Sequence, residues 1–263
     1  MSGHRLTVLV VGATGSIGRH VVTEALHQGH AVRALVRDLE RATDLPSEAQ
    51  RVVGDLTQPE SLSAAAQGID AIVFTHGSDG GKAAAEQVDY GGVRNVLQAL
   101  GGRSARVALM TSIGVTNRQG DYNRTTQIHD WKRRGERLLR ASGLPYTIVR
   151  PGWFDYNAPD QHRLVLLQGD TRQAGDPSDG VISRQQIAKV LVHSLTSDAA
   201  RAKTFELVAE RGAAQKELEP LFAALQPDAA GALDAVRDSA NMPLADEPTR
   251  VLEELARFST PKR

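Results

Sequence analysis

The chain has 263 residues, in which 31 Lys and Arg residues balance 31 Asp and Glu residues, and it contains no cysteine. A formal net charge of zero gives no general attraction to nucleic acid or anionic membranes, and the lack of thiols excludes disulfides, thiolate catalysis and Cys-bound zinc. The apolar run at residues 6–11 is too short for a signal-peptide core or a membrane span, so we expect a cytoplasmic protein with no membrane or nucleic-acid partner.

Short runs rich in valine and isoleucine alternate with helix-like stretches over the first 150 residues. This alternation predicts βαβ units and a parallel sheet. We expect strands at residues 6–11, 31–36, 51–53, 71–75, 106–111 and 146–149, and helices at residues 16–27, 59–66, 83–100 and 126–141.

The pattern changes after Pro151, where loops rich in Pro, Asp and Gly become frequent. We expect strands at residues 163–168 and 204–209, and a helix at residues 184–195 whose N-cap is Ser183. The tail, from about residue 215, is rich in Ala, Leu and Glu and is expected to be helical, with breaks near Pro227 and Pro243. Residues 156–263 would then form a small C-terminal substrate-binding part and a helical tail, packed on residues 1–155 as a single structural unit.

Three glycines directly follow the first expected strand and open the first expected helix. Gly12 permits a tight turn, Gly15 lets the backbone approach a pyrophosphate, and Gly18 lets the helix lie close to the sheet. The free N–H groups at the start of the helix attract phosphate. The pattern therefore predicts an α/β Rossmann-type doubly wound parallel sheet, with a nicotinamide dinucleotide bound by Gly12, Ala13, Thr14, Gly15, Ser16, Ile17 and Gly18.

The end of the second expected strand should face the adenosine ribose. An arginine there accommodates the 2′-phosphate of NADP, whereas an acidic residue holds the 2′-hydroxyl of NAD. Arg37 comes first, and Arg33 alternates with it and could add to the positive field, so NADP is favoured. NAD stays possible because Asp38 follows directly and a shift of one residue would reverse the preference. Arg37 also fits an ordinary solvated charge.

The ends of the third and fourth expected strands supply further cofactor contacts. Asp55 can accept a hydrogen bond from the adenine amino group and Leu56 can cover the ring, although Asp55 also fits a turn. Thr75, His76 and Gly77 end the fourth strand, where small residues let the backbone run beside the cofactor.

Residues 12–18, Arg37, residues 54–56, 88–95 and 132–152 resemble the atypical short-chain dehydrogenase/reductases, especially their NAD(P)H-binding, NmrA-like and flavin-reductase-like subgroup. The match covers about residues 5 to 210, and residues 142–152 are its most specific part beyond the glycine turn. The resemblance implies that Ser112 lies near the nicotinamide, that Lys132 reaches the nicotinamide ribose, and that Pro151 flanks the nicotinamide. Ser112 and Lys132 are therefore the candidate catalytic residues. Alternatively, Ser112 is a turn residue and Lys132 pairs with Glu136 one turn on.

One departure from that superfamily concerns the reaction. Most of its enzymes carry a tyrosine four residues before the lysine, which exchanges a proton with the substrate, but here that position is Ile128. An isoleucine transfers no proton. His129, Asp130, Tyr122 and His76 are possible substitutes, and each also fits a solvated polar side chain.

The remaining features set the limits of the functional prediction. The eight histidines give no convincing metal set, and the basic residues of segment 132–140 fit a solvated helix face better than a nucleic-acid site. Trp153, Phe154 and Tyr156 either wall a substrate pocket or belong to the core. We expect a monomeric or homodimeric NADP-dependent oxidoreductase that acts on a small conjugated acceptor, such as a quinone or flavin. The alternative is a non-catalytic NADP(H)-sensing or scaffolding protein; a sugar-nucleotide epimerase or dehydratase is less favoured because it also needs the tyrosine.

Overall fold

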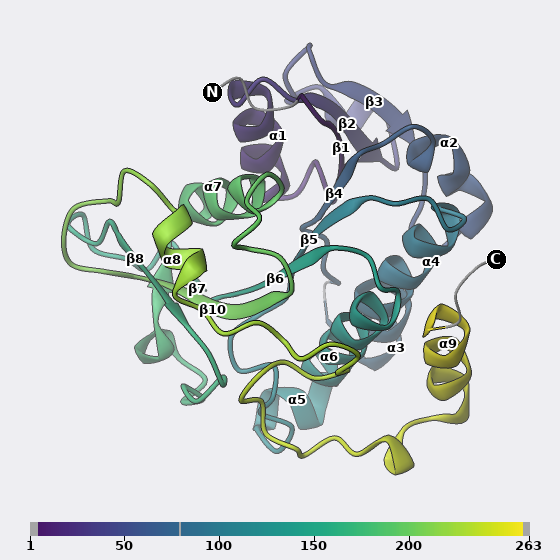
Figure 1. The fold of residues 1–263 in the computed structure, drawn as a ribbon. Helices are drawn as coiled ribbons and strands as arrows, with labels where there is room; N and C mark the ends of the chain where they lie inside the picture. The colour runs from purple at the N-terminus through teal and green to yellow at the C-terminus, as the bar shows by residue number, and fades with distance from the viewer. Residues whose placement is uncertain (1–4, 79, 260–263) are drawn as a thin grey trace.

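A computed structural model describes residues 5–78 and 80–259. These residues form one sheet with helices on both faces (Figure 1). Its strands run in the order β3-β2-β1-β4-β5-β6-β10-β9-β7, and β8 pairs antiparallel with β10. The strands are β1 (Thr7–Val11), β2 (Ala31–Val36), β3 (Gln50–Val53), β4 (Ala71–Phe74), β5 (Arg106–Met110), β6 (Tyr146–Pro151), β7 (Trp153–Phe154), β8 (Arg163–Leu167), β9 (Val181–Ile182) and β10 (Lys203–Glu210).

The sheet is parallel from β3 through to β10, so the expected Rossmann-type doubly wound arrangement is confirmed. Strand β1 lies between β2 and β4, and the chain order reverses at this point. In open α/β sheets, ligands bind at such a switch point, outside the carboxyl ends of the strands. The fold therefore places the glycine turn that follows β1 at the expected binding edge. The strands β7 and β9, two residues each, were not predicted.

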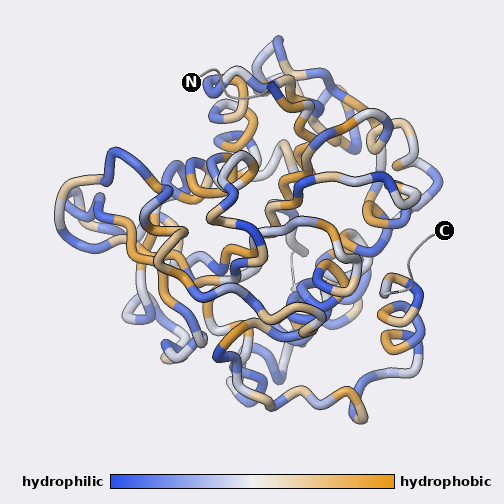
Figure 2. Tube along the Cα trace, viewed as in Figure 1, coloured by the Kyte–Doolittle hydropathy of each residue, from blue (hydrophilic) through white to orange (hydrophobic). Residues whose placement is uncertain are grey.

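Alternating side chains of the central strands fill two separate cores. On β1, Val8 and Val10 belong to the core with α1 and α7, whereas Leu9 and Val11 belong to the core with α4, α6 and α9. Figure 2 shows the resulting concentration of hydrophobic residues along the central strands. A strand buried on both faces must be apolar at every position, which is why its sequence was easy to recognise.

The helices cover both faces of the sheet, with α1 and α7 side by side on one of them (Figure 1). Two expected helices differ in detail. The helix expected at residues 126–141 begins later, because Gln127, with φ of 57°, separates α5 from α6. The expected 83–100 helix contains a π-helical stretch, Ala85–Tyr90. The α-helices are α1 (Gly18–His27), α2 (Ser63–Ala66), α3 (Lys82–Ala84), α4 (Gly91–Ala99), α5 (Asp121–Thr126), α6 (Ile128–Ala141), α7 (Arg184–Ser194), α8 (Glu219–Ala223) and α9 (Thr249–Ser259).

The tail is helical only in part. It contains the short α8 and the terminal α9, but no α-helix is found among the described residues 224–248. This stretch passes along α6, and α9 then packs against α6 from the other end (Figure 1). The expectation of a helical tail with breaks near Pro227 and Pro243 is met by α8 and α9, but the stretch between them is longer than a break. Carboxylates and carbonyls of this stretch accept hydrogen bonds from the arginines of α6.

The basic face of α6 is the largest correction. Its arginines were expected to be solvated, yet all four are buried by the tail. Arg137 shows the pattern: its guanidinium donates to Asp234 at 2.7 Å and to Glu247 at 2.9 Å. A buried charge requires such partners, because desolvation otherwise disfavours it. The arginines are Arg133, Arg134, Arg137 and Arg140, and their acidic partners in the tail are Asp228, Asp234 and Glu247.

Within residues 5–78 and 80–259, no helix has both the length and the apolar character needed to cross a membrane.

Candidate cofactor and substrate site

The glycine turn has a tightly constrained backbone. Gly12 has φ of +84°, and a Cβ atom there would lie 2.8 Å from the backbone nitrogen of His76. A Cβ atom on Gly18 would lie 2.0 Å from the carbonyl oxygen of Gly12, so the first turn of α1 touches the loop directly. Only glycine fits at either position. Ala13 and Ile17 are buried and hold the loop against the core. Gly15 and Ser16 are exposed at the outer surface of the loop, and Thr14 is half-buried.

The second strand ends with Arg37, which is exposed and makes no hydrogen bond or ion pair with the described part of the chain. Asp38, by contrast, accepts a hydrogen bond from the backbone of Glu40 at 2.9 Å and lies 3.9 Å from Arg41. Its carboxylate therefore serves the turn in which it lies. Arg33 donates to the carbonyl of Ala65 at 2.9 Å, and its contribution to the positive field beside Arg37 stays a prediction.

Asp55 and Leu56 lie at the end of β3. One carboxylate oxygen of Asp55 accepts hydrogen bonds from both the backbone and the hydroxyl of Thr57, each at 2.8 Å. The backbone bond, together with the hydroxyl and the charge of Arg37, outweighs partial burial and lowers the pKa of Asp55. The turn role considered for Asp55 is thus present, and its second carboxylate oxygen has no partner in the described structure.

The chain after β4 passes between the glycine turn and α4. Thr75 donates its hydroxyl to the carbonyl of Val11 at 3.0 Å, which ties this segment to β1. The His76 ring is buried, and a Cβ atom on Gly92 would lie 2.9 Å from its Nε2. Burial lowers the pKa of His76 to about 4, so its imidazole is neutral at neutral pH. Gly77 follows beside Lys132, whose Nζ would lie 3.8 Å from a Cβ atom there.

Lys132 is held by a residue that the sequence did not single out. Its Nζ donates to Oδ1 of Asp89 at 2.6 Å, and Oδ2 of Asp89 accepts from the Ser78 hydroxyl at 2.6 Å. Burial opposes ionisation of Asp89, but the charge and hydrogen bond of Lys132, together with the hydrogen bond from Ser78, outweigh burial and lower the pKa of Asp89. The alternative pairing of Lys132 with Glu136 was wrong, because Glu136 is fully buried against Arg150 on another side of α6. Asp89 lies in the stretch predicted as a helix over residues 83–100, and nothing in that stretch indicates a contact with Lys132.

A cavity of about 690 Å³ lies at the carboxyl ends of β5 and β6. It brings together the three residues that the resemblance placed at the nicotinamide: Ser112, Lys132 and Pro151. Trp153 and Phe154, on β7, also line it, as does Tyr156, whose ring packs edge-on against Trp153 at 6.2 Å between centroids. Trp153 and Phe154 are half-buried and Tyr156 is exposed. The pocket alternative therefore fits Trp153 and Tyr156, whereas Phe154 both lines the cavity and packs against the core.

The hydroxyl oxygen of Ser112 is buried and has no hydrogen-bond partner in the described structure. Buried polar groups are almost always paired, so an unpaired hydroxyl at the wall of a cavity fits a site that a ligand completes. The exposed outer surface of the glycine turn and the unpaired Arg37 are likewise free to contact a ligand, and they lie at the same carboxyl edge of the sheet. The donor set therefore fits a dinucleotide that runs from Arg37 to Ser112.

Asp170 was missed by the sequence analysis and shapes the same cavity. Its carboxylate accepts from the backbone nitrogens of Gly114 at 2.6 Å and Thr116 at 2.7 Å, and from the Thr116 hydroxyl. It has φ of 49°, an uncommon conformation for a residue other than glycine. These contacts fix the loop that follows β5, on which Ser112 lies.

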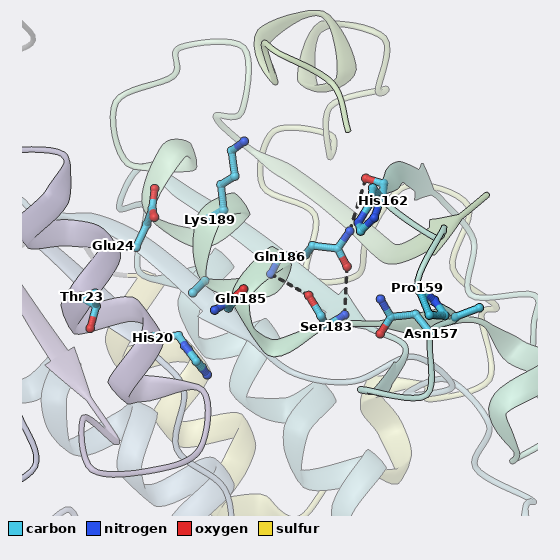
Figure 3. A pocket seen from close by; sticks show the side chains of 12 residues that line it. His20, Thr23, Glu24, Asn157, Pro159, His162, Ser183, Gln185, Gln186 and Lys189 are labelled. Atoms are coloured by element: carbon cyan, nitrogen blue, oxygen red, sulfur yellow. Dashed lines mark hydrogen bonds between the residues drawn. The ribbon is translucent and has the colours of Figure 1, made fainter. Parts of the chain in front are cut away.

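A second hollow, of about 610 Å³, lies between α1 and α7 (Figure 3). Residues from α1, including His20 and Glu24, face Lys189 and the segment around His162. Ser183 and Gln186 close a capping box at the start of α7, in which each side chain bonds the backbone of the other. Among the described residues, no group of three or more His, Asp or Glu side chains could hold a metal ion.

A glycine turn between β1 and α1 lies at the switch point of a parallel sheet, and a partly aromatic cavity follows it along the same edge. These features define a dinucleotide-binding protein of the Rossmann type. The chain belongs to the NAD(P)H-binding family, whose model matches residues 12–198.

Two curated relatives illustrate the range of this family. The chain is 31% identical over 215 residues to the photosystem II assembly factor Ycf39 of Synechocystis sp., which covers 78% of this chain but only 63% of that protein. It is 26% identical over 269 residues to the sanguinarine reductase of Eschscholzia californica, covering 84% of this chain and 96% of the relative.

Solved structures share the fold. A putative NAD-dependent epimerase/dehydratase from Bacillus halodurans has a TM-score of 0.69 and 26% identity, and covers 84% of this chain and 100% of its own. A short-chain dehydrogenase/reductase from Veillonella parvula, solved in complex with NADP, has a TM-score of 0.60 and 19% identity, and covers 81% of this chain and 98% of its own.

Proposed function

We propose that this protein is an NADP(H)-dependent oxidoreductase that reduces a small conjugated acceptor, such as a quinone or a flavin. The observation that carries the proposal is the cavity in which Ser112, Lys132 and Pro151 meet the rings of Trp153 and Phe154. Flat aromatic walls favour a flat acceptor. The polar side chains of Ser112, which follows β5, and Lys132, on α6, line the same cavity. A relative named as a reductase supports the reaction class.

In this proposal, the glycine turn binds the pyrophosphate through residues 12–18, and Arg37 binds the 2′-phosphate. Asp55 and Leu56 hold the adenine, and residues 75–77 run beside the cofactor. Lys132, held by Asp89, contacts the nicotinamide ribose, while Ser112 and Pro151 flank the nicotinamide. A bound reduced dinucleotide supplies a hydride, and the protein orients the acceptor and excludes water.

The class of acceptor is inferred from the residue that α6 carries in place of the usual tyrosine. The side chain at the position of the usual tyrosine, Ile128, is buried and lines the cavity as an apolar group. A conjugated acceptor spreads the negative charge that a hydride adds over its π-system, so it depends less on an acid than an isolated carbonyl does. We propose a small-molecule substrate, a cytoplasmic location and a monomeric or homodimeric state.

A second candidate function is a non-catalytic NADP(H)-sensing or scaffolding protein. It is favoured by the neutralisation of Lys132 by Asp89, which leaves no free cation to acidify a proton donor, and by the relative named as an assembly factor.

Oxidation of NADPH, followed at 340 nm with a panel of quinones, flavins and aldehydes, tests the two functions. Turnover of quinones or flavins at a rate above that of the free cofactor supports the oxidoreductase. Tight NADPH binding with no turnover on any acceptor would instead support the sensor.

Replacing Arg37 with alanine tests the cofactor preference. Loss of a charge-assisted hydrogen bond costs about 1.5–3 kcal/mol, so we expect the Kd of NADPH to rise about 10- to 100-fold. The Kd of NADH should change less than about twofold, and both are measured by fluorescence titration. Arg41→Ala, at an exposed neighbouring site, is the control and should leave both constants unchanged. Equal losses for both cofactors in Arg37→Ala would overturn the preference for NADP.

A further inference from the structure

Tyr122 brings a phenol into the substrate cavity from a helix other than α6. It lies on α5 and lines the same cavity as Ser112 and Lys132. Its ring packs edge-on against His129, with centroids 5.3 Å apart. The side chain is 57% exposed, and its hydroxyl makes no hydrogen bond within residues 5–78 and 80–259.

The break between the two helices produces this position. Gln127 is in the left-handed conformation, so α5 ends there and α6 starts in a new direction. Asn123 and Asp130 then fasten α5 to α6 by a reciprocal pair of bonds, from Asn123 Nδ2 to Asp130 Oδ1 at 3.0 Å and from the Asp130 backbone nitrogen to Asn123 Oδ1 at 3.2 Å. Arg118 donates to the same carboxylate at 3.0 Å. Tyr122, one residue before Asn123, is thereby held at the mouth of the cavity.

The other groups considered as substitutes for the missing tyrosine are engaged elsewhere or neutral. Asp130 is occupied by Arg118 and Asn123. Burial lowers the pKa of His129, which favours its neutral form. His76 is buried within the segment that runs beside the cofactor, and burial lowers its pKa to about 4. Among these candidates, Tyr122 is the one with an O–H group that is both unpaired and open to solvent.

We propose that Tyr122 is the proton donor of the reductase, replacing from α5 the phenol that Ile128 lacks on α6. The inference rests on the proposed function. When hydride adds to a carbon of the acceptor, the Oη–H bond of Tyr122 breaks and a new bond joins that proton to the acceptor's oxygen or nitrogen. The phenolate left on Tyr122 then takes a proton from the solvent, to which the side chain is open.

The electrostatics of the site agree with this direction of transfer. Burial and the nearby charge of Asp89 raise the pKa of Tyr122, so the phenol carries its proton at neutral pH. Tyr122 and Lys132, which pairs with Asp89, line the same cavity. Tyr156, the second phenol of the cavity, packs instead against Trp153.

The decisive variant is Tyr122→Phe. Its control is Thr125→Val, which removes a hydroxyl from an exposed position of α5 that does not line the cavity. General acids contribute about 10²- to 10⁴-fold, so we expect kcat with menadione or an aromatic aldehyde to fall at least about 100-fold in Tyr122→Phe. The Kd of NADPH should stay within about twofold of the wild type, because the phenol does not hold the cofactor. Thr125→Val should leave kcat unchanged.

A binding measurement separates this proposal from the proposed function. Menadione is titrated into the cofactor-free protein, with quenching of tryptophan fluorescence as the signal. Loss of the phenol O–H should weaken binding about 5- to 10-fold in Tyr122→Phe, whereas Thr125→Val should bind menadione as the wild type does. If the wild type reduces no acceptor, the proposed reductase fails, and this proposal fails with it even if menadione binds through Tyr122. If the wild type is active, unchanged kcat or unchanged menadione affinity in Tyr122→Phe would overturn the proposal alone.

Discussion

Replacing Glu136 with glutamine is expected to lower the stability of the folded protein by about 3–5 kcal/mol, because two buried arginines each lose one of their acidic partners. Glu136 is fully buried on α6. Its carboxylate accepts from Arg150 at 2.7 and 3.0 Å and from the Thr111 hydroxyl at 2.7 Å, and it lies 3.4 Å from Arg140. The amide of glutamine keeps the shape but removes the charge, so two guanidinium groups lose one of their acidic partners.

The same residue gives the protein a defined acid sensitivity. Burial opposes ionisation of Glu136, but Arg150, Arg140 and Thr111 outweigh it and lower the pKa from 4.5 to about 2. A carboxylate whose pKa is lower in the folded state stabilises that state fully above pH 4.5, and this contribution is lost as the pH falls towards 2. Glu136→Gln should therefore lose less stability than the wild type over that acid range.

Thermal unfolding followed by circular dichroism at pH 7 and at pH 3, which lies between 4.5 and 2, measures both effects. At pH 7 we expect the Tm of Glu136→Gln to fall by about 10 °C. Glu253→Gln, at an exposed position on α9, is the control and should leave the Tm unchanged. A Tm of Glu136→Gln within 2 °C of the wild type would show that the ion pair with Arg150 contributes nothing net.

The sheet was predictable because each strand carries its own signal. A strand such as β1 is buried on both faces, so its apolar run is visible without knowledge of its neighbours. The glycine turn was predictable for the same reason. Gly12 and Gly18 meet each other across six residues, so strand, turn and helix lie in one short segment.

The basic face of α6 was not predictable because its explanation lies elsewhere in the chain. Arg137 is 97 residues from Asp234 and 110 residues from Glu247. A run of charged residues on a helix usually faces solvent, and nothing local to α6 distinguishes the two cases. Lys132 and Asp89, 43 residues apart, present the same difficulty within the candidate site.

The tail is expected to be required for folding. A chain that ends at residue 226 lacks Asp228, Asp234 and Glu247, which pair with the four buried arginines of α6. Removal of the tail exposes these arginines and uncovers the apolar residues against which Val251 and Leu255 pack, so the shortened chain loses its ion pairs and part of its core together. Arg150 also loses Asp238, which it contacts at 2.8 Å. We therefore expect the truncated chain to be insoluble or unfolded by circular dichroism.

A single substitution distinguishes the contribution of the tail's ion pairs to stability from that of its apolar contacts. Glu247 is buried and accepts from Arg134 at 2.6 Å and Arg137 at 2.9 Å, so Glu247→Gln should lower the stability by about 3 kcal/mol. Asp246→Asn changes an exposed carboxylate one residue earlier and should have no effect. Limited proteolysis should cleave residues 224–248 faster in Glu247→Gln than in Asp246→Asn, because the tail is then held less firmly on α6. Equal cleavage rates and equal Tm values would mean that apolar contacts such as Val251 and Leu255, rather than the ion pairs, hold the tail in place.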